Sequence, residues 1–225
     1  MSSSLYHLAL HPKSSTSRPP LLILLHGVGS NEQDLFEIAP LLDERLLILS
    51  ARAPLTLARN SFAWFHVSFT PAGSSINADE AESARQIVSG FVQEMVQKYH
   101  ADPKRVYLLG FSQGAIISQS VMLTMPEILA GVVAMSGRIL PEVKPLVVSP
   151  ERLRDFPVLV VHGLHDTVLP IQNGRASRDY FSTLPVNLMY REYPMGHEVT
   201  EQSLLDVRKW LALQLDSRGE RVDGL

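Results

Sequence analysis

Short, continuously apolar segments recur along this chain, and they limit the possible fold more than any other feature. Residues 21–25 read Leu-Leu-Ile-Leu-Leu, and residues 158–161 read Val-Leu-Val-Val. A strand with one face in water alternates apolar and polar side chains, whereas a strand covered on both faces is apolar throughout. Parallel sheets are covered on both faces, so these segments predict the central strands of a mostly parallel sheet.

Seven segments have strand character, and helical patterns lie between them. The predicted strands are residues 5–10, 21–26, 46–50, 106–110, 131–136, 158–162 and 187–193. Alternation of strands and helices indicates an α/β fold with helices on both faces of a central sheet. The first strand can join this sheet as an antiparallel edge strand.

Several of the predicted helices have recognisable starts. Apolar side chains recur at spacings of three and four in two long segments, residues 78–99 and 201–215. Asn77 and Thr200 are the expected N-caps of these two helices. Ser30 and Gln33 have the spacing of a capping box, which predicts a further helix over residues 31–42.

The composition fits one compact domain without a nucleic-acid partner. The chain has 225 residues, of which 45% are hydrophobic and 19% charged, so it can bury a substantial core. This length predicts a single domain over residues 1–215, and the polar end at residues 216–225 is expected to fray. The formal net charge is −3, and no basic block offers a surface for a nucleic-acid backbone.

Cysteine is absent, which excludes disulfides, cysteine-based metal centres and a cysteine nucleophile. The first residues show no basic segment followed by an apolar core, so no signal peptide is expected. The aliphatic run at residues 21–25 is too short to cross a bilayer. We therefore expect a cytoplasmic protein with no stable membrane insertion.

The sharpest motif is Gly110-Phe111-Ser112-Gln113-Gly114, which lies between a predicted strand and a helical pattern. Glycine, any residue, serine, any residue and glycine at such a turn is typical of a nucleophile elbow. The turn raises the hydroxyl at the carboxyl end of the strand, above a helix N-terminus that favours negative charge. Ser112 is therefore the predicted nucleophile, and the alternative is a glycine-bracketed turn with an inert serine.

A serine nucleophile needs a histidine base and a carboxylate that orients this base. Where the serine lies in an elbow, the chain order is serine, acid and then histidine. Asp166 lies just after the strand at residues 158–162, and His197 lies in the loop before the last helix. Both loops belong to the carboxyl edge of the sheet, so Asp166 and His197 are predicted to complete a triad. His162, at the end of its strand, is expected to have a packing role.

The tetrahedral intermediate of acyl transfer needs N–H donors that form an oxyanion hole. One predicted donor is the backbone N–H of Gln113, which follows the nucleophile. The other is expected in the loop His26-Gly27-Val28-Gly29, which ends an earlier strand. Val28 is the favoured residue in this loop. These are main-chain roles, so they do not depend on the side chains.

Two other kinds of site fit the sequence less well. Gly27-Val28-Gly29 resembles the start of a dinucleotide fingerprint, but Glu32 occupies the third glycine position and would repel a pyrophosphate. His162, His165 and Asp166 offer ligand types that zinc accepts, but no separate cluster completes the set. No cofactor and no metal are therefore expected.

Aromatic and aliphatic residues could form the wall of a pocket for an acyl group. Trp64 and Phe65 lie in an aromatic loop and are candidate substrate-binding residues, with a role as core anchors as the alternative. Residues 137–150 combine aliphatic side chains with prolines, where a lid or a pocket rim could form.

Taken in order, these motifs resemble the phospholipase/carboxylesterase family of small α/β-hydrolases, which also holds the acyl-protein thioesterases. The matching blocks are residues 25–29, 110–115, 162–170 and 196–198, and residues 130–137 form a further family-like strand. The resemblance implies an α/β-hydrolase fold without a large cap domain, and it implies that no cofactor is needed. It also implies Ser112, Asp166 and His197 as the triad and Val28 and Gln113 as oxyanion donors. Several members of the family form dimers, so a homodimer is an implied partner.

One position departs from the family pattern. The tryptophan–aromatic pair of the family is often followed by aspartate, but here His66 follows Trp64 and Phe65. The loop at residues 68–77 gives no family substrate to carry over. These departures leave the triad intact and concern the substrate pocket alone.

The sequence therefore predicts a serine hydrolase that cleaves carboxylic esters of small or acyl-chain substrates through an acyl-enzyme. An acyl-protein thioesterase or a lysophospholipase would use the same chemistry on another leaving group. The alternative from a different class is a catalytically silent binding protein with a hydrolase fold.

Overall fold

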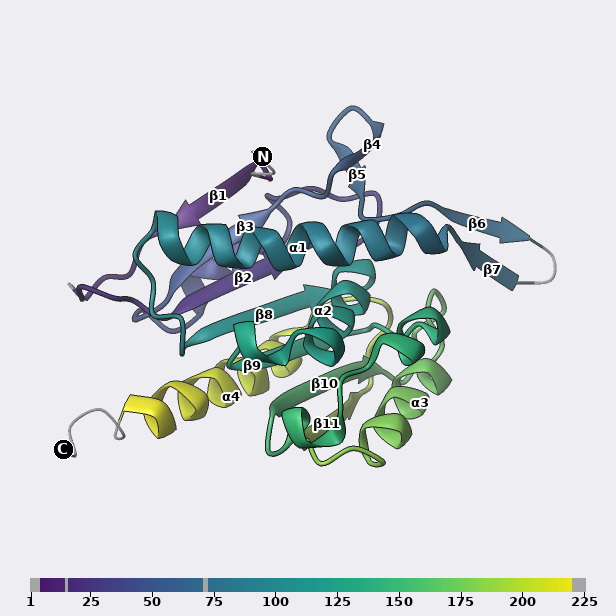
Figure 1. Cartoon of the computed structure of the whole chain (residues 1–225). Helices are drawn as coiled ribbons and strands as arrows, with labels where there is room; N and C mark the ends of the chain where they lie inside the picture. Colours follow the sequence, from purple (N-terminus) through teal and green to yellow (C-terminus); the bar gives the residue numbers. More distant parts are fainter. Residues whose placement is uncertain (1–4, 15, 71–72, 220–225) are drawn as a thin grey trace.

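Seven strands form one sheet in the order β1-β3-β2-β8-β9-β10-β11 (Figure 1). The computed structural model describes residues 5–14, 16–70 and 73–219. The strands are β1 (His7–Leu10), β2 (Leu21–Leu25), β3 (Leu47–Ala51), β8 (Val106–Phe111), β9 (Gly131–Met135), β10 (Pro157–Gly163) and β11 (Asn187–Tyr193). β1 pairs antiparallel with β3, and every other neighbouring pair in this sheet is parallel. All seven predicted strands and the antiparallel edge are therefore confirmed.

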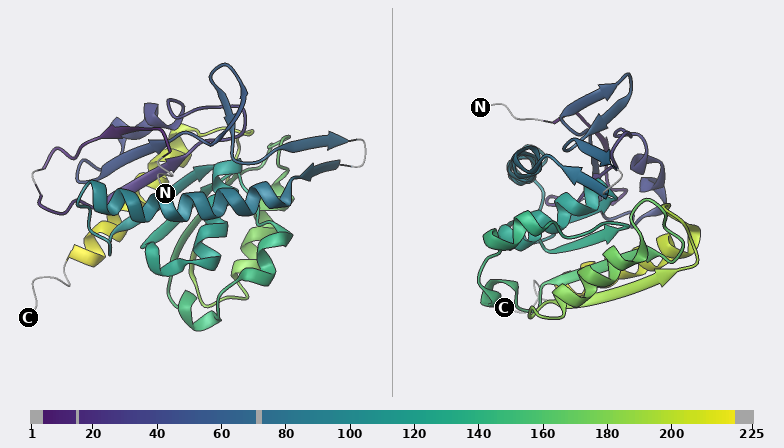
Figure 2. Two further views of the ribbon diagram at one scale, coloured as in Figure 1. Left: turned by 45° about the horizontal axis from the view of Figure 1, so that its top comes forward. Right: turned by 90° about the vertical axis from the view of Figure 1, so that its right-hand side faces the viewer.

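Helices cover both faces of the sheet (Figure 2). One layer holds α1 (Ala78–Lys98), α2 (Gln113–Thr124) and α3 (Ile171–Phe181), and the other holds α4 (Glu201–Gly219) and the 3₁₀ helix η1 (Leu35–Leu41). Three more 3₁₀ helices follow α2 in the chain: η2 (Pro126–Ile128), η3 (Pro141–Leu146) and η4 (Pro150–Leu153). The fold is a mostly parallel sheet with helices on both faces, as predicted, and no large cap domain is evident in the described part of the chain.

The continuously apolar β2 divides its side chains between the two layers. Leu21, Ile23 and Leu25 belong to the core beneath α1, α2 and α3, whereas Leu22 and Leu24 belong to the core beneath η1 and α4. All five side chains are fully buried. Fully burying one such side chain contributes about 1.5–3 kcal/mol, so β2 stabilises both layers at once.

The two long helices begin at their expected caps. The side chain of Asn77 accepts a hydrogen bond of 3.2 Å from the N–H of Glu80 at the start of α1. Thr200 Oγ1 accepts one of 3.3 Å from the N–H of Ser203 at the start of α4. Both predicted N-caps are confirmed.

The helix predicted over residues 31–42 is wrong in type and extent. The segment forms the short 3₁₀ helix η1, and Ser30 donates its hydroxyl hydrogen to Asp34 rather than capping a helix. The side chain of Asn31 instead accepts the N–H of Gln33 at 2.9 Å, which makes a local turn. Pro40 has no N–H to donate, so an α-helical hydrogen bond is impossible at that position.

Two hairpins and a helical extension were not predicted. β4 (Leu55–Ala58) pairs with β5 (Ser61–Ala63), and β6 (Val67–Thr70) pairs with β7 (Gly73–Ile76). The second hairpin projects from the end of the molecule where α1 begins (Figure 1). α4 continues to Gly219, beyond the predicted end of the domain, and residues 220–225 lie outside the described residues. Across the described ranges, no helix has the length and apolar character needed to span a membrane.

Candidate active site

Ser112 occupies a sharp turn between β8 and α2, with a φ of 53° that residues with a side chain rarely adopt. Two glycines make this turn possible. A Cβ added to Gly110 would lie 2.5 Å from the backbone nitrogen of Ala115, and one added to Gly114 would overlap the carbonyl group of Leu25. Gly110 therefore packs against the start of α2 and Gly114 against the end of β2, so neither position can hold a larger residue.

The three predicted triad residues lie in one hydrogen-bonded chain. Nε2 of His197 is 2.9 Å from Oγ of Ser112, and Nδ1 of His197 is 2.7 Å from Oδ2 of Asp166. The residues follow β8, β10 and β11, so they come from the carboxyl ends of three parallel strands. The ring of Phe111 packs against the imidazole with 4.9 Å between the ring centroids. Such a chain allows the imidazole to take the serine proton while the carboxylate orients the ring.

The carboxylate of Asp166 is held by the loop that carries it. Oδ1 accepts hydrogen bonds from the backbone N–H groups of Val168 at 2.9 Å and Leu169 at 2.8 Å. Oδ2 is then turned toward His197. Asp166 is 5% exposed, so little water competes for these contacts. The loop after β10 therefore fixes both the position and the orientation of the carboxylate.

His162 has the packing role that the sequence predicts. Its Nε2 donates to the carbonyl oxygen of Leu169 at 2.7 Å, and a Cβ on Gly174 would lie 2.7 Å from its ring, so α3 packs directly on the imidazole. His165 is exposed and does not join His162 and Asp166 in a ligand set. Among the described residues, no group of three or more histidine, aspartate or glutamate side chains is placed to hold a metal ion.

Both predicted oxyanion donors border the nucleophile. Val28 and Gln113 line the same cavity as Ser112. Gln113 is the first residue of α2, so its N–H has no acceptor within the helix. Val28 belongs to the loop after β2. Because β2 pairs in parallel with β8, this loop lies directly beside the elbow that follows β8. The structure thus brings the two residues together beside the nucleophile.

His26 anchors the loop that carries Val28. Its Nδ1 donates to the carbonyl oxygen of Gly27 at 2.7 Å, and its Nε2 accepts the N–H of Ala53 at 3.0 Å. Burial lowers the pKa of His26. The neutral ring can accept a hydrogen bond at Nε2, which a protonated ring cannot, so burial and the Ala53 contact support each other.

The side chain of Gln113 holds the aromatic loop in place. Its Nε2 donates to the carbonyl oxygen of Phe65 at 2.6 Å, and its Oε1 accepts the N–H of Trp64 at 2.7 Å. The indole N–H of Trp64 donates to the carbonyl oxygen of His26 at 2.9 Å. Both aromatic residues are buried, but Phe65 lines the cavity beside Ser112, whereas Trp64 packs behind it as a core anchor.

The cavity beside Ser112 has a volume of about 50 Å³. Its apolar wall consists of Val28, Phe65, Val67, Ile76, Ile116, Val168 and Leu169, and its polar lining consists of Ser112, Gln113 and Arg138. Ile76, Ile116, Val168 and Leu169 were not predicted as pocket residues, whereas Arg138 lies in the segment 137–150, where a pocket rim was expected. Arg138, Val168 and Leu169 follow the carboxyl ends of β9 and β10, which is the signal that could have found them.

His66 ties the aromatic loop to α1. Its backbone N–H donates to Oε2 of Glu80 at 2.7 Å, and its ring Nδ1 lies 2.9 Å from the same oxygen. These contacts, the backbone hydrogen bond first, lower the pKa of Glu80. The residue that departs from the family pattern therefore makes an exposed contact at the first turn of α1, where the β6–β7 hairpin leads into the helix.

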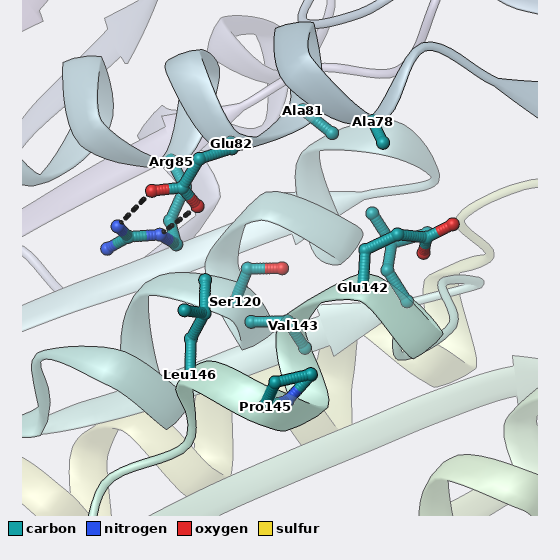
Figure 3. Close-up of a pocket in the computed structure, with 10 residues that line it drawn as sticks. Ala78, Ala81, Glu82, Arg85, Ser120, Glu142, Val143, Pro145 and Leu146 are labelled. Atoms are coloured by element: carbon teal, nitrogen blue, oxygen red, sulfur yellow. Dashed lines mark hydrogen bonds and ion pairs between the residues drawn. The ribbon is translucent and has the colours of Figure 1, made fainter.

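A second cavity, of about 200 Å³, lies between α1, α2 and η3 (Figure 3). Within it, Arg85 is paired with Glu82, and the hydroxyl of Ser120 donates to the carbonyl oxygen of Ile116 at 2.9 Å. Leu140, Val143, Pro145 and Leu146, from the segment expected to form a lid or rim, line this cavity rather than the one beside Ser112. Arg85, Glu82 and Ser120 already have hydrogen-bond partners, and Glu142, which also lines the cavity, is exposed.

The parallel sheet, the elbow and the hydrogen-bonded serine, histidine and aspartate define an α/β-hydrolase. The crystal structure of esterase PE8 superposes on this fold with a TM-score of 0.79 at 23% identity, covering 93% of this chain and 99% of that chain. A carboxylesterase of Bacillus cereus superposes with a TM-score of 0.78 at 20% identity, covering 95% and 96% of the two chains. At these identities the likeness concerns the fold alone.

The sequence matches the phospholipase/carboxylesterase family over residues 11–215, and the chain belongs to this family. Carboxylesterase SOBER1 of Arabidopsis thaliana is 26% identical over 86% of this chain and 90% of that relative. Acyl-protein thioesterase 1 of Cryptococcus neoformans var. neoformans is 28% identical over 94% of this chain and 98% of that relative. The family is thus one of esterase-type enzymes.

Two relatives from Oryza sativa subsp. japonica show that membership of the family does not by itself establish activity. One, named as a probable carboxylesterase, is 27% identical over 71% of this chain, and the match spans 60% of its own length. The other, named as a probable inactive carboxylesterase, is 28% identical over 91% of this chain and 90% of its own length. The activity of this particular chain therefore has to be argued from its own residues.

Proposed function

We propose that this chain is a serine hydrolase that cleaves carboxylic esters through an acyl-enzyme formed on Ser112. The observation that carries the proposal is the hydrogen-bonded chain from Ser112 through His197 to Asp166, with distances of 2.9 and 2.7 Å. An apolar cavity opens directly beside the hydroxyl. A nucleophile, a base and a place for an acyl group are the minimum that this chemistry requires.

In the acylation step, Oγ of Ser112 attacks the ester carbonyl while Nε2 of His197 takes its proton. The tetrahedral oxyanion accepts hydrogen bonds from the N–H groups of Gln113 and Val28, and each such donor typically contributes about 2.7–4 kcal/mol. His197 then gives the proton to the leaving alcohol. Water attacks the acyl-enzyme by the same route, which releases the acid and restores Ser112.

The size of the cavity favours a short acyl group. Pockets that enclose a drug-sized ligand have volumes of roughly 300–1,000 Å³, whereas the cavity beside Ser112 holds about 50 Å³. A long acyl chain would have to extend beyond it. We therefore place a small-ester carboxylesterase ahead of an acyl-protein thioesterase or a lysophospholipase, which would use the same residues on other leaving groups.

A silent binding protein remains the candidate from another class, because one relative is named as inactive. Turnover by this chain is supported by the contacts that join Ser112, His197 and Asp166. A binding protein would be under no physical requirement to keep this geometry. A covalent probe of active serines therefore separates the two functions directly.

The test combines a fluorophosphonate probe with a series of p-nitrophenyl esters from acetyl to palmitoyl. We expect labelling at Ser112 and a rate maximum at short chains, with both lost in Ser112→Ala and His197→Ala. Ser182→Ala, which removes an exposed hydroxyl at the end of α3, is the matched control and should behave as wild type. Near-wild-type turnover in either triad variant would overturn the proposal, and a maximum at long chains would overturn the preference for short esters.

A further inference from the structure

Among the described residues that line the cavity beside Ser112, Arg138 alone has a cationic side chain. It lies after β9, the strand next to β8 in the sheet, so it enters the lining of this cavity from the neighbouring strand. Its carbonyl oxygen accepts a hydrogen bond of 3.4 Å from the side chain of Gln119 on α2. The backbone at Arg138 is therefore held against the helix that begins at the elbow.

Arg138 is half-buried, and no carboxylate of the described residues forms an ion pair with its guanidinium. Other arginines of the chain do have such partners. The pairs include Arg52 with Glu32, Arg85 with Glu82, Arg105 with Asp102 and Arg175 with Glu192. A guanidinium is always charged and presents several N–H donors in a plane. Arg138 thus offers a charge and hydrogen-bond donors at the cavity that no group of the described chain uses.

The surroundings of Arg138 favour an anionic partner. Apolar side chains form most of the wall, and charges attract each other more strongly beside such a wall than in bulk water. The other polar lining groups are committed, because Ser112 bonds with His197 and the amide of Gln113 holds the aromatic loop. A planar carboxylate matches the guanidinium fork with two parallel hydrogen bonds.

The position of Arg138 also indicates which part of an ester it would bind. The leaving alcohol has to lie beside Nε2 of His197, which returns the proton to it. His197 does not line the cavity that holds Arg138, although Ser112 does. The cavity is therefore on the acyl side of the reacting carbonyl. A substrate anion that binds Arg138 belongs to the acyl group of the ester.

We propose that Arg138 selects esters whose short acyl group ends in a carboxylate, that is, half-esters of small dicarboxylic acids. This inference rests on the ester hydrolysis proposed above and names the substrate class of the same site. Water and the half-ester give the free dicarboxylate and the alcohol, and Arg138 exchanges no proton or bond. Arg138 is accordingly a specificity-determining residue whose loss alters the choice between charged and neutral acyl groups.

The decisive substrates are monomethyl succinate and methyl succinamate, which differ only by a terminal carboxylate or carboxamide. Release of methanol gives kcat/KM for each. We expect wild-type protein to prefer the charged ester by roughly ten- to a hundredfold, the range that a hydrogen bond to a charged group contributes. Monomethyl malonate and monomethyl glutarate then show which distance from the carbonyl suits Arg138.

Variants are judged by the ratio of the two rates, because general damage to the enzyme cancels in it. Arg138→Gln should bring the ratio close to one, whereas Arg138→Lys should keep part of it, since lysine retains the charge but not the planar fork. Arg208→Gln removes the same charge from the exposed face of α4 and should keep the wild-type ratio. An unchanged ratio in Arg138→Gln would overturn the proposal.

A second pair of substrates tests the side of the ester. In 4-acetoxybutanoate and 4-acetoxybutanamide, the charge lies on the alcohol part, and a preference confined to this pair would overturn the acyl-side assignment. Hydrolysis of methyl succinamate at the rate of the half-ester would overturn this inference while the proposed esterase stands. No turnover of any ester and no labelling of Ser112 would overturn the proposed function itself.

Discussion

At the scale of single residues, the proposed mechanism depends on the orientation of the Asp166 carboxylate. Two backbone N–H groups fix Oδ1 of Asp166, which leaves Oδ2 facing Nδ1 of His197. This contact requires a proton on Nδ1, so Nε2 is left free to accept the proton of Ser112. The tautomer of His197 is therefore set by a loop after β10.

Replacing Asp166 by asparagine should abolish this control while keeping the fold. The amide oxygen can still accept the N–H groups of Val168 and Leu169, but its NH₂ group would then face Nδ1 of His197 and force the proton onto Nε2. By analogy with the general triad, we expect kcat to fall about 10⁴-fold. Ester hydrolysis measures this loss, and thermal unfolding checks the fold. The control is Asp179→Asn, which is exposed on α3 and should keep wild-type rates. A loss smaller than about tenfold in Asp166→Asn would contradict the role of Asp166 as the orienting carboxylate.

Residues that act through a motif could be predicted from sequence, whereas residues that act through packing could not. The elbow and the chain order led to Ser112, Asp166 and His197, which the structure brings together. Trp64 and Phe65 are neighbours of the same chemical type, and only the direction of each side chain decides that Phe65 borders the cavity. The place of Arg138 depends likewise on how the chain turns after β9.

At the scale of elements, the elbow works because a strand, a turn and a helix pack with no spare room. Gly114→Ala should push α2 away from β2, because the new Cβ would overlap the carbonyl group of Leu25. Overpacking of this kind typically costs about 1–3 kcal/mol, and a displaced nucleophile about 10² in rate. We expect a lower Tm and slower labelling of Ser112 by the fluorophosphonate probe.

The matched control for this prediction is Gly196→Ala, since the nearest atom to a Cβ there is 3.7 Å away, on Glu198. That distance is ordinary van der Waals contact, so its Tm should stay close to the wild-type value. A Gly114→Ala protein with the wild-type Tm and labelling rate would show that α2 can shift without cost, against the geometry of the elbow.

An element could be predicted from sequence when the pattern of its own side chains determines its secondary structure. The central strands are apolar along their whole length because both faces are buried, and this pattern appears in the sequence alone. The short hairpins β4–β5 and β6–β7 have no such pattern. η1 was misread because Ser30 and Gln33 have the spacing of a cap, while their real partners are Asp34 and Asn31.

At the scale of the whole molecule, we expect stability at low pH to depend on carboxylates paired with arginines, of which the pair of Glu192 with Arg175 joins β11 to α3. Glu192 of β11 accepts hydrogen bonds of 2.8 and 2.9 Å from Arg175 of α3 and one of 2.9 Å from the hydroxyl of Tyr190. The contact with Arg175 is the main cause that lowers the pKa of Glu192 to about 2, from an ordinary value of 4.5. Hydrogen bonds to arginine also lower the pKa values of Glu32, Asp43 and Glu82, which lie elsewhere on the molecule.

A carboxyl group whose pKa is lower in the folded than in the unfolded protein stabilises the fold above the unfolded value, and this contribution is lost as pH falls through the folded value. We therefore expect the Tm to fall as pH is lowered from about 4.5 toward 2, the window that Glu192 defines. Glu192→Gln should lower the Tm at neutral pH and show a weaker fall of the Tm within this window, because its side chain no longer titrates.

Glu201→Gln, exposed on α4, controls for the removal of one carboxylate and should follow the wild-type curve. Thermal unfolding at a series of pH values measures all three, and equal slopes for wild type and Glu192→Gln would show that the Arg175 contact contributes nothing to acid stability.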